Sequence, residues 1–146
     1  MICATEAFCS DVVAIDDKYV YEIECKTSKR DMWIGELAKG KHYANKQQEE
    51  ATSYYFRPNK YYMCVPPELT EEALKWVASV NDKYGIIECN GDFHHNIKFV
   101  KRAKLLHNRP TNDYRIKRLM LRVCSENIGF LERQVKCNER QNTTSV

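Results

Sequence analysis

Three charged side chains stand at alternate positions near the amino terminus of the chain. Glu22, Glu24 and Lys26 are spaced by two residues, so on an extended strand all three point to one side. Asp11 lies in the preceding run of strand-forming residues. An aspartate opposite a glutamate across two strands puts the carboxylates roughly 5 Å apart, where they repel each other unless a cation lies between them. Carboxylate oxygens bind divalent cations, so the pattern indicates a metal site.

The residues around this charged strand predict a β-hairpin. The runs Val12–Ile15 and Tyr19–Ile23 are rich in β-branched and aromatic residues, and the segment 16–18 between them reads Asp-Asp-Lys, which is typical of a turn. The two aspartates of the turn lie roughly 15 Å along the strand from Asp11. We therefore exclude them from the site.

The sequence leaves two hairpin registers open. A loop over 16–19 places Asp11 opposite Glu24, and a two-residue turn at 16–17 places Asp11 opposite Glu22. The alternative to a metal site is a charged sheet face in contact with water, because antiparallel sheets often expose one polar side.

Length and composition indicate one ordinary globular domain. The 146 residues are 43% hydrophobic and 29% charged, with a net charge of +3, which permits a nucleic-acid partner without requiring one. No apolar run approaches the length of a membrane span, and we expect no membrane partner. Seven cysteines without a CxxC motif indicate a reducing, intracellular compartment.

The order of the predicted elements defines a fold class. They are a strand within 1–10, the hairpin, a helix capped by Asp31, a strand over 60–65, a helix from Thr70, strands over 84–89 and 97–100, and an amphipathic helix over 112–134. This order predicts an α/β domain over 1–135, with its core in 1–107 and a mixed β-sheet flanked by helices. A polar, disordered tail is expected over 136–146.

Two of these helices carry further expectations. The helix at Asp31 is expected to turn Trp33, Ile34, Leu37 and Ala38 inward and to present a cationic stripe of Lys39, Lys41, His42 and Lys46. The last helix is expected to turn Ile116, Leu119, Met120, Val123 and Ile128 inward.

Longer segments resemble a known superfamily. Asp11 followed by Glu24-Cys25-Lys26 resembles the motif of PD-(D/E)xK nucleases. The strings DVVAIDDKYVYEIECKTSKRD, GKHY, KYYMCVPPEL, YGIIECNG and VKRAKLLH, in this order, resemble the MmcB-type proteins of DNA repair and their phage relatives. The resemblance covers roughly residues 4–107 and implies a restriction-endonuclease-like core. It also implies a location in the cytoplasm of a bacterial or phage-infected cell.

The resemblance also implies roles for individual residues. Asp11 and Glu24 would hold Mg²⁺, or Mn²⁺ in its place, with the Cys25 carbonyl and Glu6 as further ligands. Lys26 would orient the attacking water and stabilise charge on the phosphoryl oxygens. Glu22 is a secondary candidate. The expected contacts with DNA phosphates are made by Lys29, Arg30, Lys39, Lys41 and His42.

Three hypotheses for function follow. The first is a metal-dependent deoxyribonuclease of DNA repair, recombination or phage DNA metabolism. The second is a catalytically inactive DNA-binding module on the same fold, because the helix that usually opens the superfamily core and the proline that often precedes the aspartate are both missing. The third is an oligomeric structural protein, compatible with either of the others as a homodimer, with an interface formed by Trp33, Tyr54, Tyr55 and Phe56.

Overall fold

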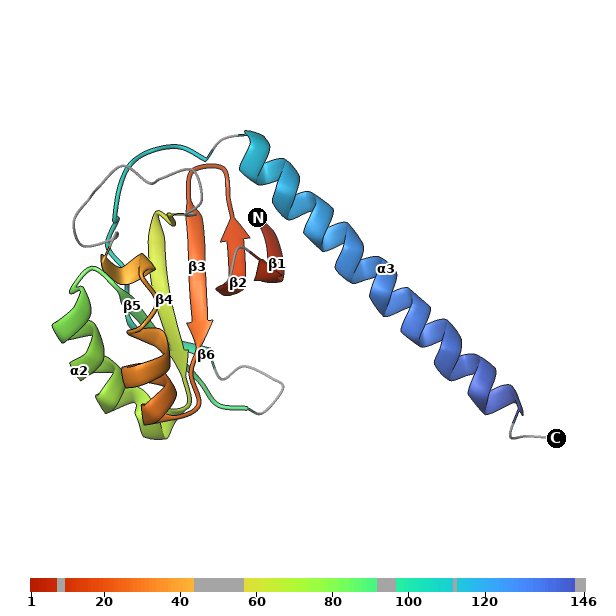
Figure 1. The fold of residues 1–146 in the computed structure, drawn as a ribbon, viewed down its shortest axis with the longest axis horizontal. Coiled ribbons are helices and arrows are strands. Elements are labelled where there is room, and N and C mark those ends of the chain that lie inside the picture. Colours follow the sequence, from red (N-terminus) through yellow and green to blue (C-terminus); the bar gives the residue numbers. More distant parts are fainter. Residues whose placement is uncertain (8–9, 44–56, 92–96, 112, 144–146) are drawn as a thin grey trace.

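A six-stranded mixed sheet organises the chain (Figure 1). The computed structural model describes residues 1–7, 10–43, 57–91, 97–111 and 113–143, with side chains up to residue 136. The strands are β1 (Ile2–Ala7), β2 (Ser10–Ile15), β3 (Val20–Cys25), β4 (Lys60–Val65), β5 (Gly85–Cys89) and β6 (Ile97–Lys101). The helices are η1 (Asp31–Glu36), η2 (Pro67–Leu69), α2 (Thr70–Val80) and α3 (Asp113–Thr143).

The strands lie in the sheet in the order of the sequence. β1, β2 and β3 form an antiparallel meander, β4 and β5 continue parallel to β3, and β6 returns antiparallel. The two parallel steps are connected through η1 and α2, as crossover connections require. The predicted mixed α/β sheet with helices, including a long C-terminal helix, is confirmed.

The hairpin adopts the longer of the two predicted loops. Ile15 pairs with Val20 and Val13 pairs with Glu22. The turn is held by Asp16, whose Oδ1 accepts hydrogen bonds from the amides of Lys18 and Tyr19 at 2.8 and 2.7 Å. This register, continued by two residues, places Asp11 opposite Glu24.

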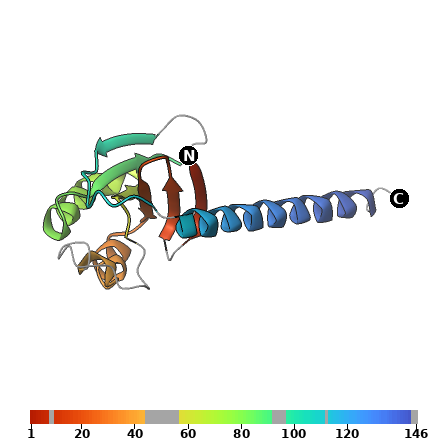
Figure 2. The same ribbon diagram turned by 90° about the horizontal axis from the view of Figure 1, so that it is seen from above.

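The main hydrophobic core lies between the sheet and the layer formed by η1 and α2, which lie side by side in Figures 1 and 2. Trp76 of α2 packs there with Tyr61 of β4, Tyr84 and Ile86, all fully buried. Burial of large aromatic side chains supplies much of the stability of a small domain.

The helix after β3 differs from the prediction in its start and its buried face. Its first turn is capped by Ser28, whose Oγ accepts from the Asp31 amide at 3.1 Å, so Asp31 is not the capping residue. Ile34 and Leu37 are exposed, contrary to expectation, and the buried side chains are those of Met32 and Glu36. A charged residue takes the inward position because lysines surround it, as described below.

α3 is longer than predicted and packs through only part of its length. It continues to Thr143, because the residues after 134 include no Gly or Pro to end it. Leu119 is buried beside β1 and β2, as expected. Met120 and Ile128 are exposed, contrary to expectation, and Figures 1 and 2 show the helix projecting away from the sheet.

Four residues with predicted roles and the predicted absence of a membrane span remain to be considered. Lys46, Tyr54, Tyr55 and Phe56 lie outside the described residues. No helix in the described part of the chain is long and apolar enough to cross a membrane.

Asn59 joins three separate parts of the chain and is almost completely buried. Its Oδ1 accepts from the Val20 amide at 2.8 Å, and its Nδ2 donates to the carbonyl oxygens of His107 and Arg109 at 3.0 and 2.9 Å. One side chain therefore connects the start of β3 to the segment that leads into α3.

We predict that Asn59→Ala lowers the free energy of unfolding by about 2–4 kcal/mol, because a buried amide and two partly buried carbonyls lose their partners. Urea denaturation followed by circular dichroism measures this. The matched control is Asn90→Ala at an exposed position, which should change stability by less than about 0.5 kcal/mol. Equal effects of the two substitutions would contradict the role assigned to Asn59.

Candidate active site

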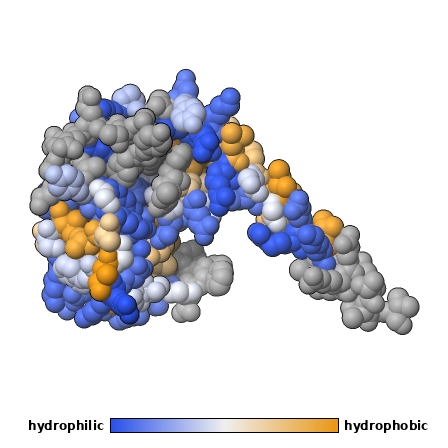
Figure 3. Space-filling view, viewed as in Figure 1, coloured by the Kyte–Doolittle hydropathy of each residue, from blue (hydrophilic) through white to orange (hydrophobic). Residues whose placement is uncertain are grey.

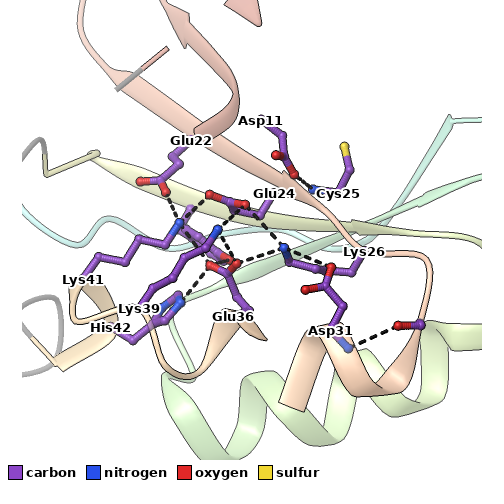
Figure 4. A network of polar contacts seen from close by, with 12 residues as sticks. Asp11, Glu22, Glu24, Cys25, Lys26, Asp31, Glu36, Lys39, Lys41 and His42 are labelled. Atoms are coloured by element: carbon purple, nitrogen blue, oxygen red, sulfur yellow. Dashed lines mark hydrogen bonds and ion pairs between the residues drawn. The ribbon is translucent and has the colours of Figure 1, made fainter. Parts of the chain in front are cut away.

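Carboxylates from two elements converge beneath β3 (Figure 4). Glu22 and Glu24 point inward from β3 and meet Glu36 of η1, and each of the three is at most 1% exposed. We call these residues and the cations around them the buried charge cluster. It consists of Glu22, Glu24, Glu36, Lys26, Lys39, Lys41 and His42.

The alternation of β3 explains why its charged residues share one side. Glu22 and Glu24 are paired with Tyr61 and Met63 of β4, which belong to the hydrophobic core. The strand path continues to Lys26, whose amide donates to a β4 carbonyl at 2.9 Å. The solvated sheet face considered from the sequence is therefore wrong, because this face is covered by η1.

Lys41 lies at the centre of the carboxylates. Its Nζ is 2.6 Å from Oε1 of Glu22, 2.5 Å from Oε1 of Glu24 and 3.0 Å from Oε1 of Glu36. A single ammonium group thus contacts all three carboxylates. This is a position that a divalent cation would occupy in a carboxylate site.

Two further lysines complete the charge balance. Lys39 Nζ lies 2.8 Å from Oε2 of Glu24 and 2.7 Å from Oε2 of Glu36. Lys26 Nζ lies 3.0 Å from Oε2 of Glu36, 3.4 Å from Asp31 and 3.6 Å from Glu24. Three ammonium groups therefore neutralise three buried carboxylates.

His42 anchors the cluster to the aromatic core. Its Nε2 lies 2.9 Å from Oε1 of Glu36, and its Nδ1 lies 3.0 Å from the hydroxyl of Tyr84. Its ring is edge-on to Trp76 at 5.2 Å, and the Tyr61 hydroxyl donates to Glu36 at 3.1 Å. These contacts fix the segment that carries Lys39 and Lys41.

The surroundings shift the proton affinities of the cluster. Burial alone would raise the pKa of Glu36, but the hydrogen bond from His42 and the charges of Lys41 and Lys39 outweigh it and hold this pKa well below its ordinary value. Burial raises the pKa of Glu22 against the opposing effect of Lys41. Burial likewise opposes the charge of Lys41, but Glu22 and Glu36 raise the pKa of Lys41 above its ordinary value.

The predicted residues are brought together only in part. Glu24, Lys26 and the secondary candidate Glu22 lie in one cluster, as the sequence indicated. Asp11 is beside them, but its Oδ2 accepts the amide hydrogen of Cys25 at 2.7 Å and not a lysine (Figure 4). The thiol of Cys25 is exposed and points away from the cluster (Figure 4).

Three other predicted residues lie apart from the cluster. Glu6 is exposed and its carboxylate is 3.9 Å from Arg122 of α3. Lys29 lies on the surface, 3.3 Å from Glu72 of α2. Arg30 is also exposed.

The cationic stripe expected to contact DNA is largely internal. Lys41 and His42 are 8% and 5% exposed, so their side chains offer little surface to DNA, and their contact with DNA phosphates stays a prediction. Lys39 retains an exposed side-chain fraction of 37%. Lys26 is also buried, so its replacement would affect stability as well as any activity.

Glu36 was not identified from the sequence. Hydrophobic periodicity assigns a glutamate to the surface, but Glu36 follows Met32 by four residues and therefore lies on the same helix face. The nearby sequence Lys39-Gly40-Lys41 supplies the cations that permit its burial. The sequence does hold a signal for the burial of Glu36. This glutamate lies four residues after an apolar residue and is followed by two lysines.

The carboxylates have the chemistry that Mg²⁺ prefers, but as arranged they do not fit an ion. Both oxygens of Glu24 lie within 2.8 Å of lysine ammonium groups, and Asp11 accepts from a backbone amide. Among the residues that the structure describes, no three His, Cys, Asp or Glu side chains are grouped to hold a metal ion. An ion at Glu24 would have to displace an ammonium group.

Comparison with known proteins gives no match. No protein-family model matches the chain, and neither a curated protein nor a solved structure matches it.

We predict that Glu36→Gln lowers the free energy of unfolding at pH 7 by about 3–5 kcal/mol, because it leaves buried lysines without a counter-charge. The pKa of Glu36 is lowered in the folded chain, so the stability it contributes is full above the ordinary value of about 4.3 and is lost as the pH falls below it. The difference between wild type and Glu36→Gln should therefore shrink in acid.

Denaturant titrations of both proteins between pH 7 and pH 3 measure this difference. Glu68→Gln, at an exposed position, is the control and should stay within about 0.5 kcal/mol of wild type at each pH. A difference for Glu36→Gln that stays constant across this range would contradict the role of its charge.

Proposed function

We propose that this chain is a DNA phosphodiester hydrolase with a restriction-endonuclease-like core, and that the buried charge cluster is its active site. Mg²⁺, with Mn²⁺ as a substitute, is the expected cofactor, and DNA repair, recombination or phage DNA metabolism is the expected setting. The proposal rests on the sequence resemblance together with the cluster described above.

The observation that carries the proposal is the free energy that burying so many charged groups in one cluster costs the fold. Taking ions out of water costs several kcal/mol each, and well-packed apolar residues in the same place are often as stabilising or more so. A small domain that buries three carboxylates with two ammonium groups, and pairs them with a third that is partly exposed, has therefore kept an arrangement that packing alone does not require. Perturbed titratable groups of this kind concentrate at functional sites.

The cluster is open to solvent on one side. Lys39 and Asp31 expose 37% and 51% of their side chains, so a phosphate group can approach beside Lys26 and Lys39. An ammonium group at this position stabilises the negative charge that builds on phosphoryl oxygens when water attacks the phosphorus and the P–O ester bond breaks. Lys26 is our candidate for this role, with Glu36, 3.0 Å from its Nζ, as the carboxylate that positions it and with Glu24 at 3.6 Å beside it.

A second function is favoured by the partners of Glu24. Because its two oxygens are already paired with Lys39 and Lys41, the cluster is electrically satisfied without an added cation. A catalytically inactive module that binds DNA on the same fold would have this property. Its DNA affinity would fall with salt and would not depend on a metal.

We predict that the purified chain cleaves DNA when Mg²⁺ or Mn²⁺ is present, and that Glu24→Gln and Lys26→Met each lower the rate by at least about 100-fold. Linear, branched and single-stranded substrates are to be tested. Because both residues are buried, unfolding curves must accompany the rates, with assays run where each variant is folded. Lys75→Met, on the exposed side of α2, is the control with unchanged rate.

The outcomes separate the two functions. Folded wild-type protein that leaves all three substrates intact would rule out the hydrolase. Salt-sensitive DNA binding that persists without metal and in Glu24→Gln would then support the inactive module.

A further inference from the structure

α3 carries two apolar stripes, and the sheet uses only one of them. Ile116, Leu119 and Val123 pack against β1 and β2. A second stripe is exposed along the same helix. It consists of Leu121, Cys124, Ile128, Leu131 and Val135.

The second stripe faces away from the sheet. At 3.6 residues per turn, its centre is rotated by roughly 120° from the stripe that contacts β1. Figure 3 shows hydrophobic residues along the part of the helix that projects from the rest of the molecule. Leu121, Ile128, Leu131 and Val135 are each between 55% and 59% exposed. A partner can therefore reach this stripe without disturbing the contact of α3 with the sheet.

The spacing of the second stripe is that of a coiled coil. Its residues are separated by three, four, three and four positions, which gives a heptad pattern with Leu121, Ile128 and Val135 at a positions. Cys124 and Leu131 occupy the d positions. Aliphatic and β-branched residues at a, with leucine at d, favour two parallel strands. Such a stripe is its own complement, because a pairs with a and d with d.

The residues that flank the seam also allow a second copy to pair without charge repulsion. The positions that flank the seam on one side are Met120 and Asn127, and those on the other side are Ser125 and Glu132. No two like charges would face each other across these flanking pairs. The arginines and lysines of this part of α3 lie at other positions of the heptad. They are Arg122, Arg133 and Lys136.

We propose that the exposed stripe of α3 is a dimer interface, in which the helices of two copies of this chain form a short parallel coiled coil. Each sheet domain remains packed on its own α3 through Leu119, on the side away from the seam. A helical segment projecting into water without such a partner is marginally stable. The second copy removes about five apolar side chains per helix from water.

Sedimentation equilibrium of the full chain tests this proposal. Wild type at about 100 µM should approach twice the 17.2 kDa of one chain. Leu131→Glu should raise the dimer dissociation constant at least about tenfold, because each seam then buries two like charges. Phe130→Glu is the matched control, since Phe130 is 54% exposed and Leu131 58%, but Phe130 lies off the seam.

Circular dichroism and unfolding curves establish that both variants are folded. A monomeric wild type at this concentration would overturn the proposal. Equal weakening by Leu131→Glu and Phe130→Glu would also overturn it, because association would then depend on general hydrophobicity.

Thiol cross-linking tests the parallel arrangement. Cys124 at a d position faces Cys124 of the second copy only when the helices run parallel and in register. A short bismaleimide should therefore produce a covalent dimer that is lost in Cys124→Ser and retained in Cys3→Ser, where the exposed thiol lies on β1. A dimer by sedimentation that does not cross-link through Cys124 would overturn the parallel arrangement.

Discussion

The contact of Lys41 with three carboxylates is the interaction on which the centre of the molecule depends. Two like charges about 4 Å apart repel by about 4 kcal/mol at an effective dielectric constant of 20, so Glu22, Glu24 and Glu36 could not share a buried site uncompensated. The ammonium of Lys41 lies 2.5 to 3.0 Å from each of them. Its attraction to the three carboxylates offsets the repulsion between them. It also fixes η1 to β3, because Glu36 belongs to one element and Glu24 to the other.

Because ion pairs join η1 to β3, η1 does not need a fully buried apolar face to hold its position. η1 presents exposed Ile34 and Leu37, so its position does not depend on an apolar stripe alone. Ion pairs and the aromatic contacts of His42 hold it in place. In a low-dielectric surrounding such contacts are strong when every partner is present and costly when one is missing. Any substrate or cation that enters must therefore compete with an existing partner, and Lys39, the more exposed lysine, is the one most readily displaced.

Much of this arrangement was predictable from local rules. Turn chemistry over 16–18 predicted the hairpin but left its register open, and the period of two placed Glu22 and Glu24 on one face. Local rules could not predict that charged side chains such as that of Glu36 are buried. Periodicity treats a charged residue as exposed, and only the convergence of Lys39 and Lys41 with Lys26, which follows β3, makes Glu36 an inward residue. The end of α3 was missed for a different reason, since polar composition was taken as disorder although no helix-breaking residue is present.

The contact of α3 with β1 explains why the helix can carry an apolar stripe on its outer side. β1 is an edge strand, and edge strands expose backbone groups that invite pairing with other chains. Here Glu126 accepts from the Thr5 amide at 3.1 Å, and Arg122 donates to the Thr5 carbonyl at 3.2 Å. Polar side chains of α3 thus satisfy the edge of the sheet at Thr5, and its apolar side chains at Leu121 and Leu131 remain outside. The outer stripe of α3 therefore lies apart from the strand edge, and the coiled coil that we propose would form there in the register set by the heptad.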